Sequence, residues 1–192
     1  MVRAVIFDCF GVLATEAWLP FKAEHFGNDP ELFEQASDIS KQANSGLISY
    51  EDFTKSIAGL AGVQPSEVHR AIVRNVPNEP LFDYIRELKP KYKIGFLSNI
   101  AGDRLKQIFT AEQLALLDVV ALSFETGFVK PQAEAYRDIA QKLAVNIGEC
   151  VLIDDQQRHV EGARQAGMQA VLYKDFEQTR ADIEKLLTDP KS

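Results

Sequence analysis

The chain contains few cysteines and no long hydrophobic run. Its 192 residues include two cysteines, Cys9 and Cys150, which lie in or beside short apolar runs, and this predicts buried reduced thiols. No apolar stretch approaches the ~20 residues that a membrane span requires. The opening residues MVRAVIFD carry one basic side chain and a brief apolar run, which is not a signal-peptide pattern. We therefore expect a cytoplasmic protein with no membrane partner.

The sequence also lacks a basic segment. Its formal net charge is −7, and acidic and basic residues are mixed along the chain. Nucleic-acid-binding proteins usually carry a basic patch, so we expect no nucleic-acid partner. A small phosphorylated substrate needs only local positive charge and is compatible with this balance. The length suits one core domain with a modest insertion, and it leaves the oligomeric state open.

Short apolar runs alternate with helical patterns over most of the chain. The runs that predict buried strands are residues 3–7, 93–97, 119–122 and 150–153, with a fifth at 169–172. The helical patterns cover residues 102–116, 132–143, 156–165 and 176–187. Continuous apolar strands that alternate with helices indicate an α/β fold, in which a parallel sheet is covered by helices on both faces.

The alternation breaks between the first two strands. Residues 15–91 contain no convincing strand, but three segments, 31–43, 49–61 and 65–76, space apolar residues three or four apart, as helices do. We expect a small all-helical cap of residues 15–91 over the end of the sheet. The core domain would then comprise residues 1–14 and 92–192, with a frayed tail TDPKS.

Polar side chains follow four of the predicted strands. They are Asp8, the pair Ser98 and Asn99, Lys130, and the pair Asp154 and Asp155. In a parallel sheet, ligands bind beyond the carboxyl ends of the strands. These residues are therefore expected to meet at one edge of the sheet.

Each of these side chains also has a purely structural explanation. Asp8 would suit a turn, and Ser98 and Asn99 would suit the start of the following helix. Lys130 would suit an exposed loop, and the acidic pair would suit a helix N-cap. Their order at successive strand ends favours a shared site.

Three carboxylates at one point repel one another unless a cation lies among them. Mg²⁺ prefers oxygen ligands and often binds one or two carboxylates together with substrate phosphate. A lysine and a hydroxyl beside such a site would help to bind a tetrahedral anion. With Asp8 placed to attack, the pattern predicts phosphoryl transfer through an aspartyl intermediate.

Four short motifs occur in order along the chain, VIFDCFGVL, FLSN, VKP and LIDD, with a helical insertion after the first. In these motifs, and in the segments FETGFVKPQAEAYRDIA and IDDQQRHVEGARQAGMQAVLY, the sequence resembles the haloacid dehalogenase-like (HAD) hydrolase superfamily. It is most similar to the branch whose cap follows the first motif. The resemblance covers nearly the whole chain and implies a Rossmann-like core with a helical cap.

The resemblance also implies a role for each motif residue in catalysis. Asp8 matches the nucleophile, and Gly11 permits the tight turn after it. Ser98 would donate a hydrogen bond to a phosphoryl oxygen, and Asn99 would help to shape that pocket. Lys130 would offset the charge of Asp8 and of the phosphoryl group.

The same resemblance implies a magnesium site. Asp8 would also be a metal ligand, and Phe10 would contribute its backbone carbonyl. Asp155 matches the acidic metal ligand, and Asp154 would lie beside it in the metal site.

The chain departs from the family pattern at three positions. Phe10 replaces the second aspartate that protonates the leaving group and then activates water, Val12 replaces the usual threonine, and His159 stands where Asn or Asp is frequent. General acid–base catalysis is worth about 10² to 10⁴ in rate, so we expect slow turnover. Glu16, His25 and His159 are the candidates to replace the missing group.

Two further functions stay open. Dehalogenases of the superfamily also lack the second aspartate, so Asp8 would displace halide in a 2-haloacid, although the pair Asp154 and Asp155 favours magnesium. A catalytically impaired protein that only binds a phosphate ligand is the other alternative. The aromatic segment 18–26 would either line an apolar substrate pocket or pack within the cap.

Overall fold

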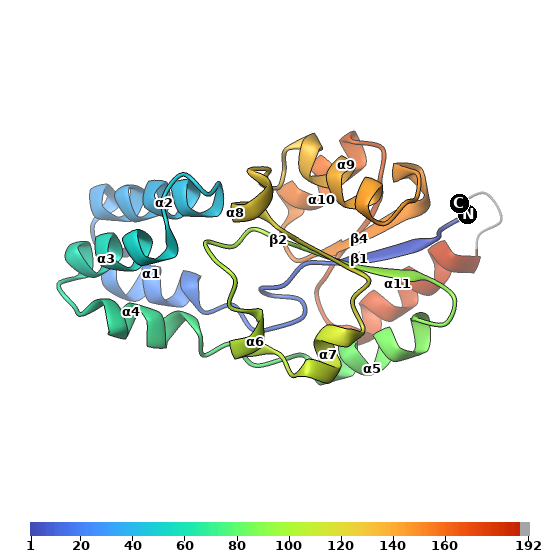
Figure 1. Cartoon of the computed structure of the whole chain (residues 1–192), viewed down its shortest axis with the longest axis horizontal. Coiled ribbons are helices and arrows are strands. Elements are labelled where there is room, and N and C mark those ends of the chain that lie inside the picture. The colour runs from blue at the N-terminus through green and yellow to red at the C-terminus, as the bar shows by residue number, and fades with distance from the viewer. Residues whose placement is uncertain (189–192) are drawn as a thin grey trace.

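The computed structural model describes residues 1–188 and contains a five-stranded sheet in the order β3-β2-β1-β4-β5 (Figure 1). The strands are β1 (Ala4–Phe7), β2 (Lys93–Ser98), β3 (Val119–Leu122), β4 (Cys150–Asp154) and β5 (Gln169–Leu172). All neighbouring strands are parallel. This confirms the predicted α/β class. Of the tail expected to fray, Thr188 ends the last helix, and residues 189–192 lie outside the described part.

Helices cover both faces of the sheet (Figure 1). The core helices are α5 (Glu79–Leu88), α6 (Leu105–Ile108), α7 (Ala111–Ala115), α8 (Ser123–Thr126), α9 (Ala133–Lys142), α10 (Gln157–Gln165) and α11 (Phe176–Thr188), with a 3₁₀ turn at Ile147–Glu149. Side chains of β1 alternate between two separate hydrophobic clusters, because successive strand residues point to opposite faces. Val5 and Phe7 belong to one cluster, whereas Ala4 and Ile6 belong to the other. Both faces of the central strand are thus buried.

The prediction of one helix over residues 102–116 is wrong. The chain forms two short helices there, α6 and α7, because Phe109 adopts an extended conformation between them. The Phe109 ring is buried against Phe82 and Phe96, with ring centroids 5.4 and 6.2 Å away. Thr110 then begins α7 by accepting a hydrogen bond from the backbone N–H of Gln113. Packing and a new cap thus interrupt a periodic pattern that would otherwise continue.

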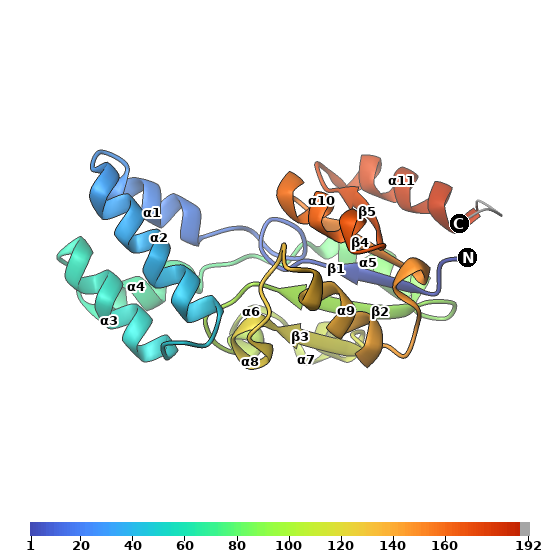
Figure 2. The same ribbon diagram turned by 90° about the horizontal axis from the view of Figure 1, so that it is seen from above.

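Four further helices form the cap, α1 (Trp18–Phe26), α2 (Pro30–Asn44), α3 (Tyr50–Ala61) and α4 (Pro65–Ile72). They lie beyond the end of the sheet in both views (Figures 1 and 2) and have a hydrophobic cluster of their own. Asp29 accepts hydrogen bonds from the first turn of α2, and Ser49 does so at α3. Among the described residues, no helix has the length and apolar character that crossing a bilayer requires.

The two connections between cap and core run side by side. Ala14 forms a β-bridge with Pro77, and the backbone N–H of Asn78 donates to the carbonyl of Leu13 at 2.9 Å. The following helix, α5, contributes its apolar side chains to a sheet cluster and not to the cap cluster. The division into a core and a cap of residues 15–91 stays a prediction, and this packing favours a cap that ends before α5.

Candidate active site

Asp8 follows β1 directly and lies at the centre of the sheet edge that faces the cap. Its Oδ1 atom accepts a hydrogen bond from the backbone N–H of Cys9 at 2.7 Å and an ion-pair contact from Lys130 Nζ at 2.8 Å. The side chain is buried but lines a cavity of about 360 Å³. Within residues 1–188 these contacts all use Oδ1, so Oδ2 is the oxygen available to a ligand.

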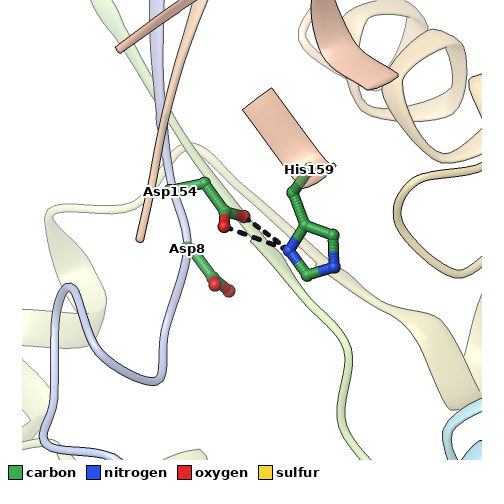
Figure 3. A group of neighbouring side chains, drawn as sticks. All are labelled: Asp8, Asp154 and His159. Carbon is green, nitrogen blue, oxygen red and sulfur yellow. Dashed lines mark hydrogen bonds and ion pairs between the residues drawn. The ribbon is translucent and has the colours of Figure 1, made fainter. Parts of the chain in front are cut away.

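Lys130 bridges two buried carboxylates. Its Nζ atom lies 2.6 Å from Asp154 Oδ2 as well as 2.8 Å from Asp8. Asp154 also accepts hydrogen bonds from the backbone N–H of Gln156 at 2.9 Å and contacts His159 Nδ1 at 3.0 Å (Figure 3). Asp154 is therefore surrounded by donors, and it holds both the lysine and the histidine in place.

Asn99 holds the backbone of Lys130. Its side-chain amide donates to the Lys130 carbonyl, and its carbonyl oxygen accepts from the Lys130 N–H, both at 2.9 Å. Asn99 also lines the cavity. The second motif thus positions the lysine of the third, which adds to the pocket-shaping role predicted from the sequence.

The electrostatics of these groups are set by burial and by Lys130. Burial raises the pKa of Asp8 to about 8, against the attraction of Lys130. Burial also opposes ionisation of Asp154, but Lys130 and His159 hold its pKa below the usual range. Despite its own burial, Lys130 has a raised pKa because it faces two carboxylates. The ammonium group is thus charged, whereas Asp8 needs a further positive charge to be fully ionised at neutral pH.

Asp155 lies against the turn that follows Asp8. Burial and the neighbouring charge of Asp154 raise its pKa to about 6, and its Oδ1 atom is buried without a hydrogen-bond partner. Gly11 has φ +83°, and a Cβ atom there would lie 2.3 Å from Asp155 Oδ2. Only glycine therefore allows this carboxylate to approach the loop of residues 9–14 so closely.

These donors fit a magnesium ion. Two carboxyl groups with raised pKa values, Asp8 and Asp155, face one loop, and Asp155 has an unpartnered buried oxygen. A hard divalent cation would lower both pKa values. The Phe10 carbonyl belongs to the same turn.

A second group of donors is less suitable. Ligand atoms of Asp8, Asp154 and His159 lie within 4.8 Å of one another (Figure 3). However, Lys130 Nζ already contacts both carboxylates, and His159 Nδ1 is directed at Asp154. An ion there would have to displace the ammonium group. The contacts of Asp154 therefore favour a positioning role over direct ligation, and its role as a ligand stays a prediction.

Ser98 ends β2 beside Asp8. Its side chain is fully buried, and its Oγ atom has no hydrogen-bond partner among the described residues. In this structure it lies behind the cavity surface and is not one of the residues that line it. The hydroxyl is therefore an unused donor near Asp8, and its contact with a phosphoryl oxygen stays a prediction.

The cavity lies between core and cap. Of the three candidates to replace the missing acid–base group, Glu16 and His159 line it, whereas His25 lines a separate groove between α1 and α4. Burial raises the pKa of Glu16 and lowers that of His159. Glu16 is thus the better proton donor of the two.

The aromatic segment 18–26 divides between its two predicted roles. Trp18 and Leu19 line the cavity, while Phe21 and Phe26 are buried in the cap cluster. The cavity therefore has a partly apolar wall on the cap side.

Comparison with known proteins agrees with this geometry. A family model described as haloacid dehalogenase-like hydrolase matches residues 2–167. The chain belongs to this family. The predicted resemblance is thereby confirmed, and Asp8, Lys130 and Asp154 all lie within the matched residues.

Three relatives of this HAD-like hydrolase show what it is similar to. Phosphatase MT3486 of Mycobacterium tuberculosis (strain CDC 1551 / Oshkosh) is 38% identical over 95 residues, which cover 47% of this chain and 43% of that protein. The alignment thus spans less than half of that relative.

The other two relatives are solved structures. The HAD family enzyme bt-2542 of Bacteroides thetaiotaomicron, in complex with magnesium and inorganic phosphate, has a TM-score of 0.74 at 22% identity and covers 91% of this chain and 95% of its own. L-2-haloacid dehalogenase of Xanthobacter autotrophicus has a TM-score of 0.66 at 20% identity, covering 99% and 85%. The fold is shared with both kinds of enzyme and does not separate them.

Arg104 is a cavity residue of the HAD-like hydrolase that was not predicted from the sequence. Arg104 lines the cavity next to Phe10, five positions after Asn99. No motif includes Arg104, and nothing in the sequence around it distinguishes it from an ordinary arginine at the start of a helix. Only the packing of its loop against the cap brings it to the site.

Removal of the central lysine is expected to destabilise the HAD-like hydrolase. Lys130→Met leaves Asp8 and Asp154 buried without their shared cation, and breaking such a buried pair costs about 3 kcal/mol of unfolding free energy. Lys142→Met is the control, because Lys142 pairs with Asp138 on the surface of α9 and should cost less than about 1 kcal/mol. Urea denaturation measures both, and equal losses in the two variants would contradict the prediction.

Proposed function

We propose that this chain is a magnesium-dependent phosphatase that acts slowly on a small phosphorylated metabolite through an aspartyl-phosphate on Asp8. The observation that carries the proposal is the buried lysine bridge, in which Lys130 Nζ lies within 2.8 Å of both Asp8 and Asp154 beside a cavity. Such a bridge places fixed positive charge where a phosphoryl group would meet the nucleophile. The phosphatase-named relative supports the same reaction.

The first step is an attack by a carboxylate oxygen of Asp8 on phosphorus. The new O–P bond forms as the ester O–P bond breaks, and the leaving alkoxide or phenolate takes up a proton. Lys130 holds Asp8 in position and stabilises the negative charge that develops on the phosphoryl oxygens. The Ser98 hydroxyl would donate to one of these oxygens. Magnesium, held by Asp8, Asp155 and the Phe10 carbonyl, would offset the remaining negative charge.

The second step is hydrolysis of the acyl phosphate. Water attacks phosphorus, loses a proton and releases inorganic phosphate, which restores the Asp8 carboxylate. Phe10 cannot transfer a proton in either step. Glu16 and His159 are the cavity residues that remain for this task, so turnover should be slow and the acyl phosphate should persist.

The proposal is tested by phosphate release from 4-nitrophenyl phosphate with magnesium and with a chelator. We expect release with magnesium, a loss of at least about tenfold with the chelator because a metal ion supplies several kcal/mol of charge stabilisation, and recovery when magnesium is returned. Magnesium should also raise the melting temperature, as any ligand of the native state does.

Two other outcomes would replace the proposal. Halide release from a short 2-haloacid that a chelator leaves unchanged would indicate a dehalogenase. Thermal stabilisation by magnesium and phosphate together, without hydrolysis of any phosphate ester, would indicate a binding protein.

A further inference from the structure

Arg104 is a buried cation in the wall of the cavity. It lies in the loop between β2 and α6, and only 8% of its surface is exposed. Its guanidinium carbon lies 5.8 Å from the centre of the Phe10 ring and 5.1 Å from that of Tyr50 in the cap. Gly102 lets this loop approach α3, because a Cβ atom there would lie 2.9 Å from Tyr50 Cβ. The arginine is thus fixed where core and cap meet.

The hydrogen-bonding capacity of Arg104 is mostly unused. A guanidinium group has five N–H donors, and within residues 1–188 the hydrogen-bond partners of Arg104 are the Ile72 carbonyl, 3.2 Å from Nη1, and the side chain of Tyr50. Its Nε atom is buried without a partner. No carboxylate of the described residues lies within 4.0 Å of it as an ion-pair partner.

A packing role explains only part of this arrangement. Stacking on Phe10 and Tyr50 stabilises a cation through the faces of the rings. It does not satisfy the N–H donors at the edge of the guanidinium, and burying a charge without a counter-charge is costly. Lys22, on α1, is similar, because this buried cavity residue donates to the Ser37 hydroxyl and has no carboxylate within ion-pair distance among residues 1–188. Two buried cations of the cavity thus have no carboxylate at ion-pair distance among the described residues, although Glu16, which also lines the cavity, is near enough to Arg104 to favour its charged form.

Arg104 is also separate from the groups around the reacting phosphorus. Asp8 directly follows β1, and Lys130, in the loop between α8 and α9, contacts it. The contacts of Arg104 are with cap residues, Tyr50 and Ile72, and with the side chain of Phe10. Because Asp8 and Arg104 line the same cavity, a substrate whose phosphoryl group meets Asp8 has room to extend its other end toward Arg104.

We infer that Arg104 binds a second anionic group of the substrate, a carboxylate or a second phosphate, through its planar N–H edge. A guanidinium fork matches both oxyanions in two-point hydrogen bonds. The substrate class is thus a small phosphate monoester that carries another oxyanion on its leaving group. This inference rests on the proposed phosphatase function and extends it to specificity.

The test uses phosphate esters that differ only in this second group. The acid is (carboxymethyl)phenyl phosphate, and the amide is (carbamoylmethyl)phenyl phosphate, whose second group is uncharged. Both are used as the 3- and the 4-isomer. For one of the two isomers, the wild type should show a KM for the acid that is at least about tenfold lower than its KM for the amide. One charge-assisted hydrogen bond is worth about this difference in affinity. Arg104→Met should bring this ratio close to one. A (phosphonomethyl)phenyl phosphate then shows which oxyanion is preferred.

Two variants separate recognition from folding. Arg104→Lys keeps the charge and should retain part of the preference for the acid. Arg70→Met removes an arginine of α4 that lines a different groove and should keep the full preference. A wild type that does not distinguish acid from amide in either isomer, or a preference that survives Arg104→Met, would overturn the inference.

Binding measurements keep the two proposals distinguishable. Isothermal titration of the Asp8→Asn variant with the acid and the amide needs no turnover, and the acid should bind about tenfold more tightly. If the wild type hydrolyses no ester but this preference is found, the inference stands and the proposed phosphatase function fails. If esters are hydrolysed without any preference, the function stands and the inference fails.

Discussion

Asp8→Asn is expected to lower the rate of phosphatase turnover by at least about 10³-fold, while the protein stays folded. An amide cannot attack phosphorus, and Asp154, the other described carboxylate that pairs with Lys130, does not line the cavity. Because burial raises the pKa of Asp8 to about 8, a neutral side chain of the same shape costs little there. The melting temperature without metal should therefore equal or exceed that of the wild type. Phosphate release and thermal unfolding, measured on the same preparation, test both parts.

The control for this loss is Asp83→Asn, which removes an exposed carboxylate of α5 that pairs with Arg86. It should leave turnover within about twofold, since surface ion pairs contribute little. Intact-mass measurement of the wild type after brief reaction should show a phosphoryl adduct that Asp8→Asn lacks. A variant that keeps more than a tenth of the wild-type rate, or that still forms the adduct, would exclude Asp8 as the nucleophile.

The strands and the site at their ends could be predicted because they depend on local patterns. Every predicted strand lies within one residue of the observed bounds, since short continuous apolar runs define strands that are buried on both faces. The meeting of Asp8 with Asp154 then follows from the rule that the carboxyl ends of parallel strands share an edge, and the loop after β3 brings Lys130 to the same edge. No tertiary information was needed for this step.

The features that the sequence missed all depend on tertiary packing. Helical periodicity continues through residues 102–116, but burial of Phe109 against two other phenylalanines divides the segment. Arg104 has no local signal, because its role comes from Tyr50, about fifty positions earlier in the chain. The bonds from Asn99 to the Lys130 backbone likewise join two distant loops. Pattern reasoning finds the residues of a motif more readily than the partners that position them.

Phe10→Asp is expected to raise the hydrolysis of an alkyl phosphate by about 10²-fold. The substitution restores a group that can protonate the leaving group and activate water, and such acid–base help is worth about 10² to 10⁴ in rate. Phe10 lines the same cavity as Asp8, so a carboxyl at this position has access to the ester oxygen. The gain should be smaller for 4-nitrophenyl phosphate, whose leaving group needs no proton. Steady-state kinetics on both esters measures this contrast.

The matched control is Phe10→Asn, which removes the same ring but cannot transfer a proton. Arg104 complicates the result, because its guanidinium carbon lies 5.8 Å from the centre of the Phe10 ring. An aspartate there would gain an ion pair with Arg104, and this pair would lower its pKa and make it a weaker acid. The gain should therefore increase further when Phe10→Asp is combined with Arg104→Met. If Phe10→Asp and Phe10→Asn act alike on the alkyl ester in both backgrounds, the missing proton donor does not limit this enzyme, and Glu16 or His159 must already supply it.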